Sequence, residues 1–154
     1  MLELLMLSKG PNLMLAFFQQ WKDKKARQNL FLDFYEELKK NLESYYVMDQ
    51  LGRFRFFRME TWLRIKNSGN PAILGDKMIN DYAQRLQEYN AVTDDFTKYE
   101  QWYGSDIENK TPANARILHD KREEPRIKFQ GLEGVIKSAI QSFEKKLLEE
   151  KILK

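Results

Sequence analysis

The sequence predicts an all-α protein, an elongated antiparallel helical bundle of three long helices plus one short helix. Three observations support this class. Apolar residues recur at steps of three and four over long stretches, as expected of helices that bury one face. Only 7 glycines and 4 prolines occur among 154 residues. These few helix breakers fall mainly between the periodic stretches, so they separate long helices better than they separate many short strands.

The first long helix is predicted from about residue 20 to residue 51. Its apolar stripe consists of Phe31, Phe34, Leu38, Leu42 and Tyr45. The residues between them are mostly charged, so this helix has one buried and one solvated face. Gly52 is expected to end it, after roughly 45 Å of helix at 1.5 Å per residue.

The short helix is predicted over residues 53–67, before the turn sequence NSGNPAILG. A helix there would place Phe54, Phe57, Thr61 and Ile65 on a core-facing stripe. Within the turn, Asn70 followed by Pro71 has the pattern of an N-cap and a first-turn proline.

The remaining two long helices follow two further start signals. Asp76 opens a stretch whose apolar stripe runs from Ile79 to Tyr103, and Gly104 is expected as the left-handed residue past its end. Thr111 and Pro112 then form a second N-cap and first-turn proline pair. The last helix should be kinked or broken near Pro125, because proline lacks the N–H that a helix interior requires.

The composition indicates one globular domain, over residues 22–154. Charged residues make up 32% and hydrophobic residues 42% of the chain, and the formal net charge is only +3. Cysteine is absent, which excludes disulfides and thiolate metal sites and favours a reducing compartment. We therefore expect a cytoplasmic protein, with the inner face of a membrane as an alternative location.

Residues 1–21 form an apolar N-terminal arm or a membrane-associating segment. Glu3 lies where a secretory signal would be basic, and Lys9 would be costly at the centre of a membrane span. Two interpretations remain. Residues 13–21 form the first turns of the long helix and are covered by the bundle, by a second copy or by another protein partner, or the segment inserts shallowly into a membrane with a basic flank. The residues expected to make either contact are Leu13, Phe17, Phe18, Trp21, Lys22, Lys24, Lys25 and Arg27.

The sequence RFRFFRMETWLRIK, residues 53–66, interleaves basic and aromatic side chains. Such a mixture suits single-stranded nucleic acid or anionic lipid headgroups. On a helix, Arg55, Arg58 and Trp62 would share a face outside the core stripe, so they are the expected contacts for an anionic ligand. The stronger interpretation is structural, with the aromatic residues in the core and the arginine stems lying over its edges.

No pattern in the chain indicates catalysis, and we predict no catalytic, cofactor-binding or metal-binding residue. His119 is the one histidine, and no phosphate-binding loop, dinucleotide-binding motif or hydrolase motif occurs. The leading hypothesis is a non-enzymatic helical bundle that acts through protein–protein contacts, as an oligomer or adaptor. The alternatives are the same bundle tethered to the cytoplasmic face of a membrane by residues 1–21, and, less favoured, a nucleic-acid-binding helical module. No small-molecule substrate is inferred.

Overall fold

The predicted all-α class is confirmed by a computed structural model that describes the backbone of residues 11–153 and their side chains, apart from those of residues 11–13 and 21. The described range contains helices and connecting segments but no strand. The helices are α2 (Pro11–Leu51), α3 (Glu60–Ser68), α4 (Pro71–Leu74), α5 (Lys77–Ser105), the 3₁₀ turn η1 (Ile107–Asn109), α6 (Pro112–Phe129) and α7 (Leu132–Glu149).

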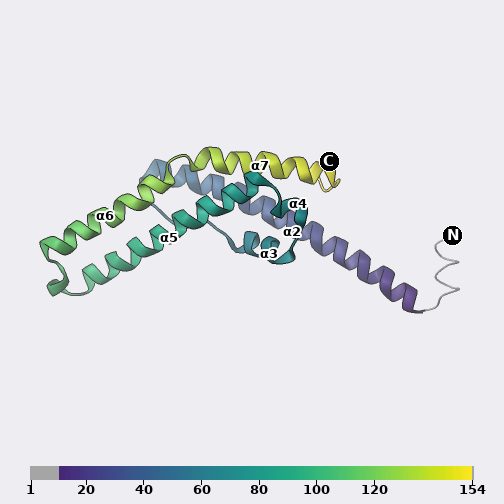
Figure 1. Cartoon of the computed structure of the whole chain (residues 1–154), viewed down its shortest axis with the longest axis horizontal. Helices are drawn as coiled ribbons and strands as arrows, with labels where there is room; N and C mark the ends of the chain where they lie inside the picture. The colour runs from purple at the N-terminus through teal and green to yellow at the C-terminus, as the bar shows by residue number, and fades with distance from the viewer. Residues whose placement is uncertain (1–10, 154) are drawn as a thin grey trace.

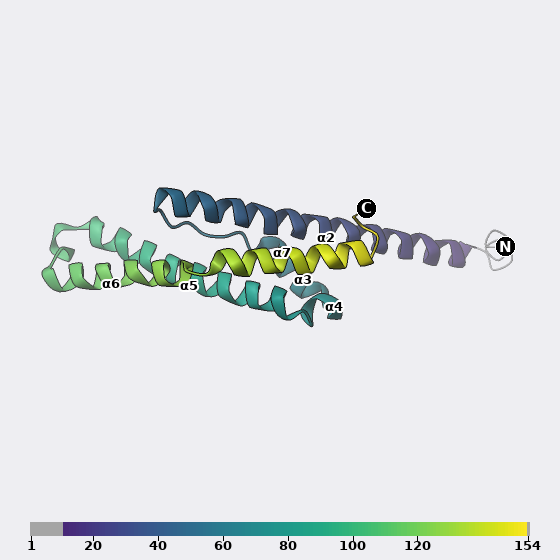
Figure 2. The same ribbon diagram turned by 90° about the horizontal axis from the view of Figure 1, so that it is seen from above.

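The chain runs up, down, up and down through an elongated bundle (Figures 1 and 2). Residues 53–68 return along α2, since Asn41 contacts Arg58 and Glu37 contacts Thr61. Helix α5 then runs parallel to α2, and the α6–α7 segment runs back along α5 and α2. Long antiparallel helices with short connections are the expected bundle topology.

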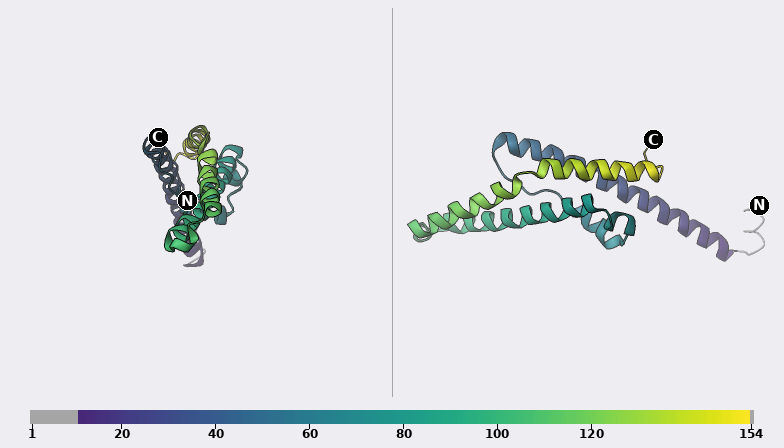
Figure 3. Two further views of the ribbon diagram at one scale, coloured as in Figure 1. Left: turned by 90° about the vertical axis from the view of Figure 1, so that its left-hand side faces the viewer. Right: turned by 45° about the horizontal axis from the view of Figure 1, so that its top comes forward.

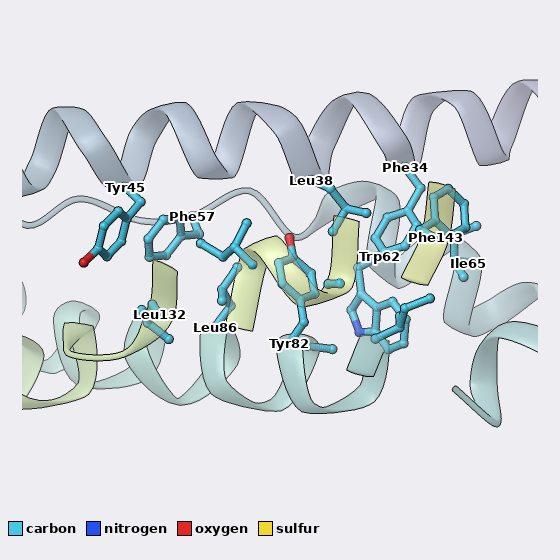
Figure 4. Close-up of a cluster of buried hydrophobic side chains, with 14 of the residues drawn as sticks. Phe34, Leu38, Tyr45, Phe57, Trp62, Ile65, Tyr82, Leu86, Leu132 and Phe143 are labelled. Atoms are coloured by element: carbon cyan, nitrogen blue, oxygen red, sulfur yellow. The ribbon is translucent and has the colours of Figure 1, made fainter. Parts of the chain in front are cut away.

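The core lies where α2, α3, α5 and α7 come together (Figure 4). Phe34 of α2 is fully buried, and its ring centre lies 4.9 Å from that of Phe143, 5.9 Å from that of Trp62 and 6.4 Å from that of Tyr82. Tilted and edge-on aromatic pairs at these distances are favourable beyond their burial of apolar area. One aromatic cluster therefore joins all four helices.

The ends of the bundle extend in opposite directions beyond this core (Figures 1 and 3). At one end the first part of α2 projects past the end of α7. At the other end α5 and α6 continue together past the end of α2 as a two-helix hairpin. The molecule is therefore longer than the part of it that holds a four-helix core.

Most predicted helix boundaries agree with the structure. Gly52 follows α2 with a φ of 65°, a left-handed conformation that favours glycine. The side chains of Asn70, Asp76 and Thr111 each accept a hydrogen bond from a backbone N–H in the first turn of the following helix. These are the N-caps that the sequence predicted.

Three details differ from the sequence-based expectations. Helix α2 begins at Pro11, whereas the first long helix was predicted from about residue 20. Residues 53–59 are extended, so the predicted helix over 53–67 is confined to Glu60–Ser68. Gly104 lies inside α5. The end of this helix is stabilised by a side chain, since the Asn109 amide donates a hydrogen bond to the Trp102 carbonyl oxygen at 2.9 Å. No left-handed residue is needed there.

The last long helix is broken near Pro125, as predicted, but the break is a few residues further along. Pro125 is buried within α6, and the chain bends at residues 130–131. Gly131 has a φ of 81°, which ends α6 and starts α7 in a new direction. The glycine permits this change of direction, and the proline is accommodated one turn earlier.

Candidate functional site

The projecting part of α2 carries large apolar side chains that no other described part of the chain covers. Met14, Leu15, Phe17 and Phe18 are 44%, 66%, 41% and 51% exposed. Four neighbouring exposed residues of this size form a patch of the kind that marks a contact surface. We call residues 14–18 the apolar segment. Of the contacts predicted here, Phe17 and Phe18 are exposed, whereas the side chains of Leu13 and Trp21 lie outside the described ones.

The apolar segment is not a continuation of the bundle core. The core-facing stripe of α2 starts at Phe31, and the positions that extend this stripe toward the N-terminus are Gln28, Arg27 and Lys24. Phe18 lies 13 residues before Phe31, a distance of roughly 20 Å along the helix. Polar residues therefore separate the apolar segment from the core, and no part of the chain that the structure describes covers it. The expected packing of this segment on the bundle is not seen among the described residues.

A basic run follows the apolar segment on the same helix. It consists of Lys22, Lys24, Lys25 and Arg27, interrupted by Asp23. All of these residues are exposed. Arg27 marks the point where α2 leaves the bundle, because it forms an ion pair with Glu150 beyond the end of α7 and its guanidinium lies 5.3 Å from the centre of the Phe31 ring. The apolar segment and the basic run thus lie together on a helix outside the core.

The segment expected to bind an anionic ligand is built differently from the prediction. Arg55 and Arg58 are exposed, but Trp62 is only 3% exposed and packs against Phe34. The expected shared face is therefore not formed, because residues 53–59 are extended and only Trp62 is helical. Phe56, between the two arginines, is 50% exposed, so the exposed aromatic side chain of this segment is Phe56 and not Trp62.

The buried Asn41 and the half-buried Asn90 hold the extended segment in place. The Asn41 amide accepts a hydrogen bond from the Arg58 N–H at 2.9 Å and donates to the Arg58 carbonyl oxygen at 2.8 Å. Asn90 makes the same pair of bonds to Phe57, at 2.9 and 3.0 Å. Each side-chain amide thus replaces the backbone partner that an extended strand would otherwise need. We call this pair the asparagine clamp.

A remote carboxylate starts α3. The residue before the helix, Met59, offers no side-chain cap. Instead the Glu37 carboxylate accepts hydrogen bonds from the N–H groups of Thr61 and Trp62, both at 2.9 Å. Burial raises the pKa of Glu37, although these two bonds oppose that effect. The asparagine clamp and the capping of α3 were both missed in the sequence. The sequence signal for each was a polar residue, Asn41 or Glu37, at or beside the apolar stripe of α2.

The α5–α6 hairpin carries three more large apolar side chains that are exposed. Trp102 is 45%, Ile107 is 82% and Ile117 is 42% exposed. Tyr99, by contrast, is half-buried, and its hydroxyl donates to the Asn114 carbonyl oxygen at 3.4 Å. Helices α2, α3 and α7 do not reach this end of the molecule (Figure 1). The exposed side chains here lie on an extension of only two helices. We call the three exposed residues Trp102, Ile107 and Ile117 the hairpin surface.

Within residues 11–153, no group of three or more histidine or acidic side chains is arranged to hold a metal ion. Among the described helices, none combines the length and the apolar character needed to cross a membrane. His119 is exposed on α6.

No family model, curated protein or solved structure matches this chain.

Proposed function

We propose that this chain is a non-enzymatic helical bundle that acts through protein–protein contacts, as an adaptor or by self-association, in the cytoplasm. The observation that supports this is the hairpin surface. Trp102, Ile107 and Ile117 are exposed on two helices that extend beyond the four-helix core. Tryptophan is enriched among the residues that contribute most to protein–protein binding.

Site-specific photocrosslinking tests this proposal. A photoreactive residue at Ile107, which is 82% exposed, should form a covalent adduct with one defined protein or with a second copy. The same probe at Lys145, an exposed position on α7, is the matched control and should form none. The adduct should disappear in a Trp102→Ala/Ile117→Ala variant that keeps its helical circular dichroism.

Light scattering gives the complementary result. Self-association predicts a particle of twice the 18.5 kDa chain mass, and the double variant should return it to a single chain. A single-chain mass together with no specific adduct from Ile107 would contradict the proposed protein contact. A single-chain mass with a specific adduct would identify an adaptor.

A second candidate function is tethering of the same bundle to the cytoplasmic face of a membrane by residues 1–21. It is favoured by the exposed apolar segment and by the basic run that follows it. This candidate uses the opposite end of the molecule from the hairpin surface, so both functions are compatible in one chain. Nucleic-acid binding is less favoured, because Trp62, one of its three expected contacts, is buried in the core.

A further inference from the structure

We infer that the projecting part of α2 binds the surface of an anionic phospholipid bilayer, with the helix lying along the interface. The apolar segment would enter the headgroup–acyl boundary, and the lysines of the basic run would contact phosphate and carboxylate headgroups, while Arg27 is paired with Glu150. This inference rests on the tethering candidate above and names its partner and its geometry. It does not depend on the hairpin surface.

The angular spread of the apolar segment fits an interface better than it fits one helix. With 100° per residue, Phe17, Met14, Phe18 and Leu15 span an arc of roughly 160° around α2. All four are at least 41% exposed, so every side of this arc is open. A pairwise helix seam covers a narrower stripe, whereas an interfacial helix buries close to half its circumference.

The position of the apolar segment along α2 leaves room for the bundle. Helix α7 packs against α2 at Phe31, whose ring contacts Phe143, and at Tyr35, whose hydroxyl donates to the Glu144 carboxylate. It ends near Arg27, which forms an ion pair with Glu150. Phe18 lies nine residues before Arg27, roughly 14 Å along the helix, so a bilayer in contact with the apolar segment would meet α2 beyond the end of α7.

The charge of the neighbouring residues identifies the kind of surface. Four basic residues and one acidic residue occupy positions 22–27, directly after the apolar segment. Lys22 lies four residues past Phe18, roughly 6 Å along the helix, so both can reach one interface. Basic side chains beside an inserted apolar face are complementary to anionic headgroups and add to the apolar contribution.

A second copy is a poorer match for the same residues. Parallel pairing of two projecting helices would place the two basic runs against each other, which is repulsive. Antiparallel pairing over the whole projection would place the basic run of each copy beside the apolar segment of the other. Neither arrangement satisfies both the apolar and the basic residues, and an anionic bilayer satisfies both.

Vesicle flotation of the full chain tests this inference. The chain should float with vesicles of a roughly seven-to-three mixture of phosphatidylcholine and phosphatidylserine, and should remain unbound with phosphatidylcholine alone at the same salt concentration. Leu15→Asp/Phe18→Asp should abolish flotation. Val47→Asp/Leu51→Asp is the matched control, because it alters two exposed apolar residues at the other end of the same helix and should leave flotation unchanged.

The basic run is tested by a charge-matched pair of variants. Lys22→Gln/Lys24→Gln should lower the partition coefficient for anionic vesicles by about tenfold or more. Lys66→Gln/Lys145→Gln removes the same charge from exposed positions elsewhere and should change it little. Equal losses in both pairs would show that only net charge matters and would overturn the role assigned to the basic run.

Three outcomes would overturn the inference as a whole: no flotation of the full chain, flotation that survives Leu15→Asp/Phe18→Asp, or a doubled mass in light scattering that this variant abolishes. The last outcome would identify a second copy as the occupant. The proposed protein contact fails separately, since it is measured by crosslinking from Ile107 and by variants of the hairpin surface.

Discussion

Phe17 and Phe34 lie on one uninterrupted helix, yet Phe17 is 41% exposed and Phe34 is completely buried. The two halves of α2 differ in what faces them. The second half packs against α3, α5 and α7, and the first half extends past the end of α7 (Figure 3). Helix formation and burial are therefore separate properties in this molecule, and apolar character alone does not tell which half of α2 belongs to the core.

The largest expected effect contrasts the two phenylalanines directly. Phe34→Ala should lower the free energy of unfolding by about 3–5 kcal/mol, because it opens a cavity among Trp62, Tyr82 and Phe143. Phe17→Ala should change it by less than about 0.5 kcal/mol. Urea denaturation of both variants measures the difference. A loss above about 1 kcal/mol for Phe17→Ala would mean that the apolar segment is covered within the folded particle.

The asparagine clamp should produce the next largest effect. Asn41→Ala leaves the backbone groups of Arg58 and the buried Tyr82 hydroxyl without the amide they contact, and should cost about 2–3 kcal/mol. The exposed Asn67 is the control, and Asn67→Ala should stay within about 0.5 kcal/mol of the parent. Similar denaturation midpoints for the two variants would show that the clamp does not hold residues 53–59.

Asp76 and Glu37, the two carboxylates that cap α5 and α3, should make contributions to stability that change with pH in opposite directions. Burial opposes ionisation of Asp76, but hydrogen bonds from the Ser142 hydroxyl and the Ile79 N–H, together with Lys146, outweigh it and lower the pKa of Asp76. The stability that ionised Asp76 contributes is thus present above its unfolded pKa of about 3.9 and is lost as the pH falls through the lowered value. Burial instead raises the pKa of Glu37, so the stability associated with its protonated form is lost as the pH rises from about 4.3 through the raised value.

Difference measurements isolate these two groups from the other carboxylates. The stability advantage of the parent over Asp76→Asn, about 1 kcal/mol at neutral pH, should shrink below about pH 4. The parent should lose stability relative to Glu37→Gln as the pH rises above about 4.3. Thermal or urea unfolding at a series of pH values reads both differences. Parallel curves for the two variants would contradict the opposite shifts.

The hairpin surface should give the smallest effect on stability. Trp102→Ala should change the free energy of unfolding by less than about 0.5 kcal/mol, since the side chain is 45% exposed on a two-helix extension. The half-buried Tyr99, which faces α6, is the comparison, and Tyr99→Ala should cost more. A loss of stability for Trp102→Ala that exceeds the loss for Tyr99→Ala, and that is seen only at high protein concentration, would show that the hairpin surface is buried in an assembly.

Much of the fold could be predicted from local patterns. The apolar stripes of α2, α5 and α7, the caps at Asn70, Asp76 and Thr111, and Gly52 depend on residues close together in the chain. Each pattern acts within one or two turns, where periodicity and capping rules apply. Residues 53–59 escaped prediction because their conformation depends on Asn41 and Asn90, which are distant in sequence.

The candidate site divides in the same way. The sequence indicated that residues 13–27 combine an apolar stretch with a basic run, and it named Phe17, Phe18, Lys22 and Lys24 as contacts. It did not show that the stripe of the core ends at Phe31, since periodicity continues without regard to the length of the neighbouring helices. It also placed Trp62 on one face with Arg55 and Arg58. That prediction assumed that residues 53–59 are helical, and in the structure they are not.

By itself the sequence determined that this protein is helical, where most of its helices begin and end, and that no cysteine chemistry is available to it. Tertiary structure alone decided which apolar residues are buried, which helix ends project, and that a glutamate on α2 starts α3. The physical reason is range. Helix periodicity and caps act over a few neighbouring residues, whereas burial and the capping of α3 by Glu37 require surfaces that meet only when distant parts of the chain are packed together.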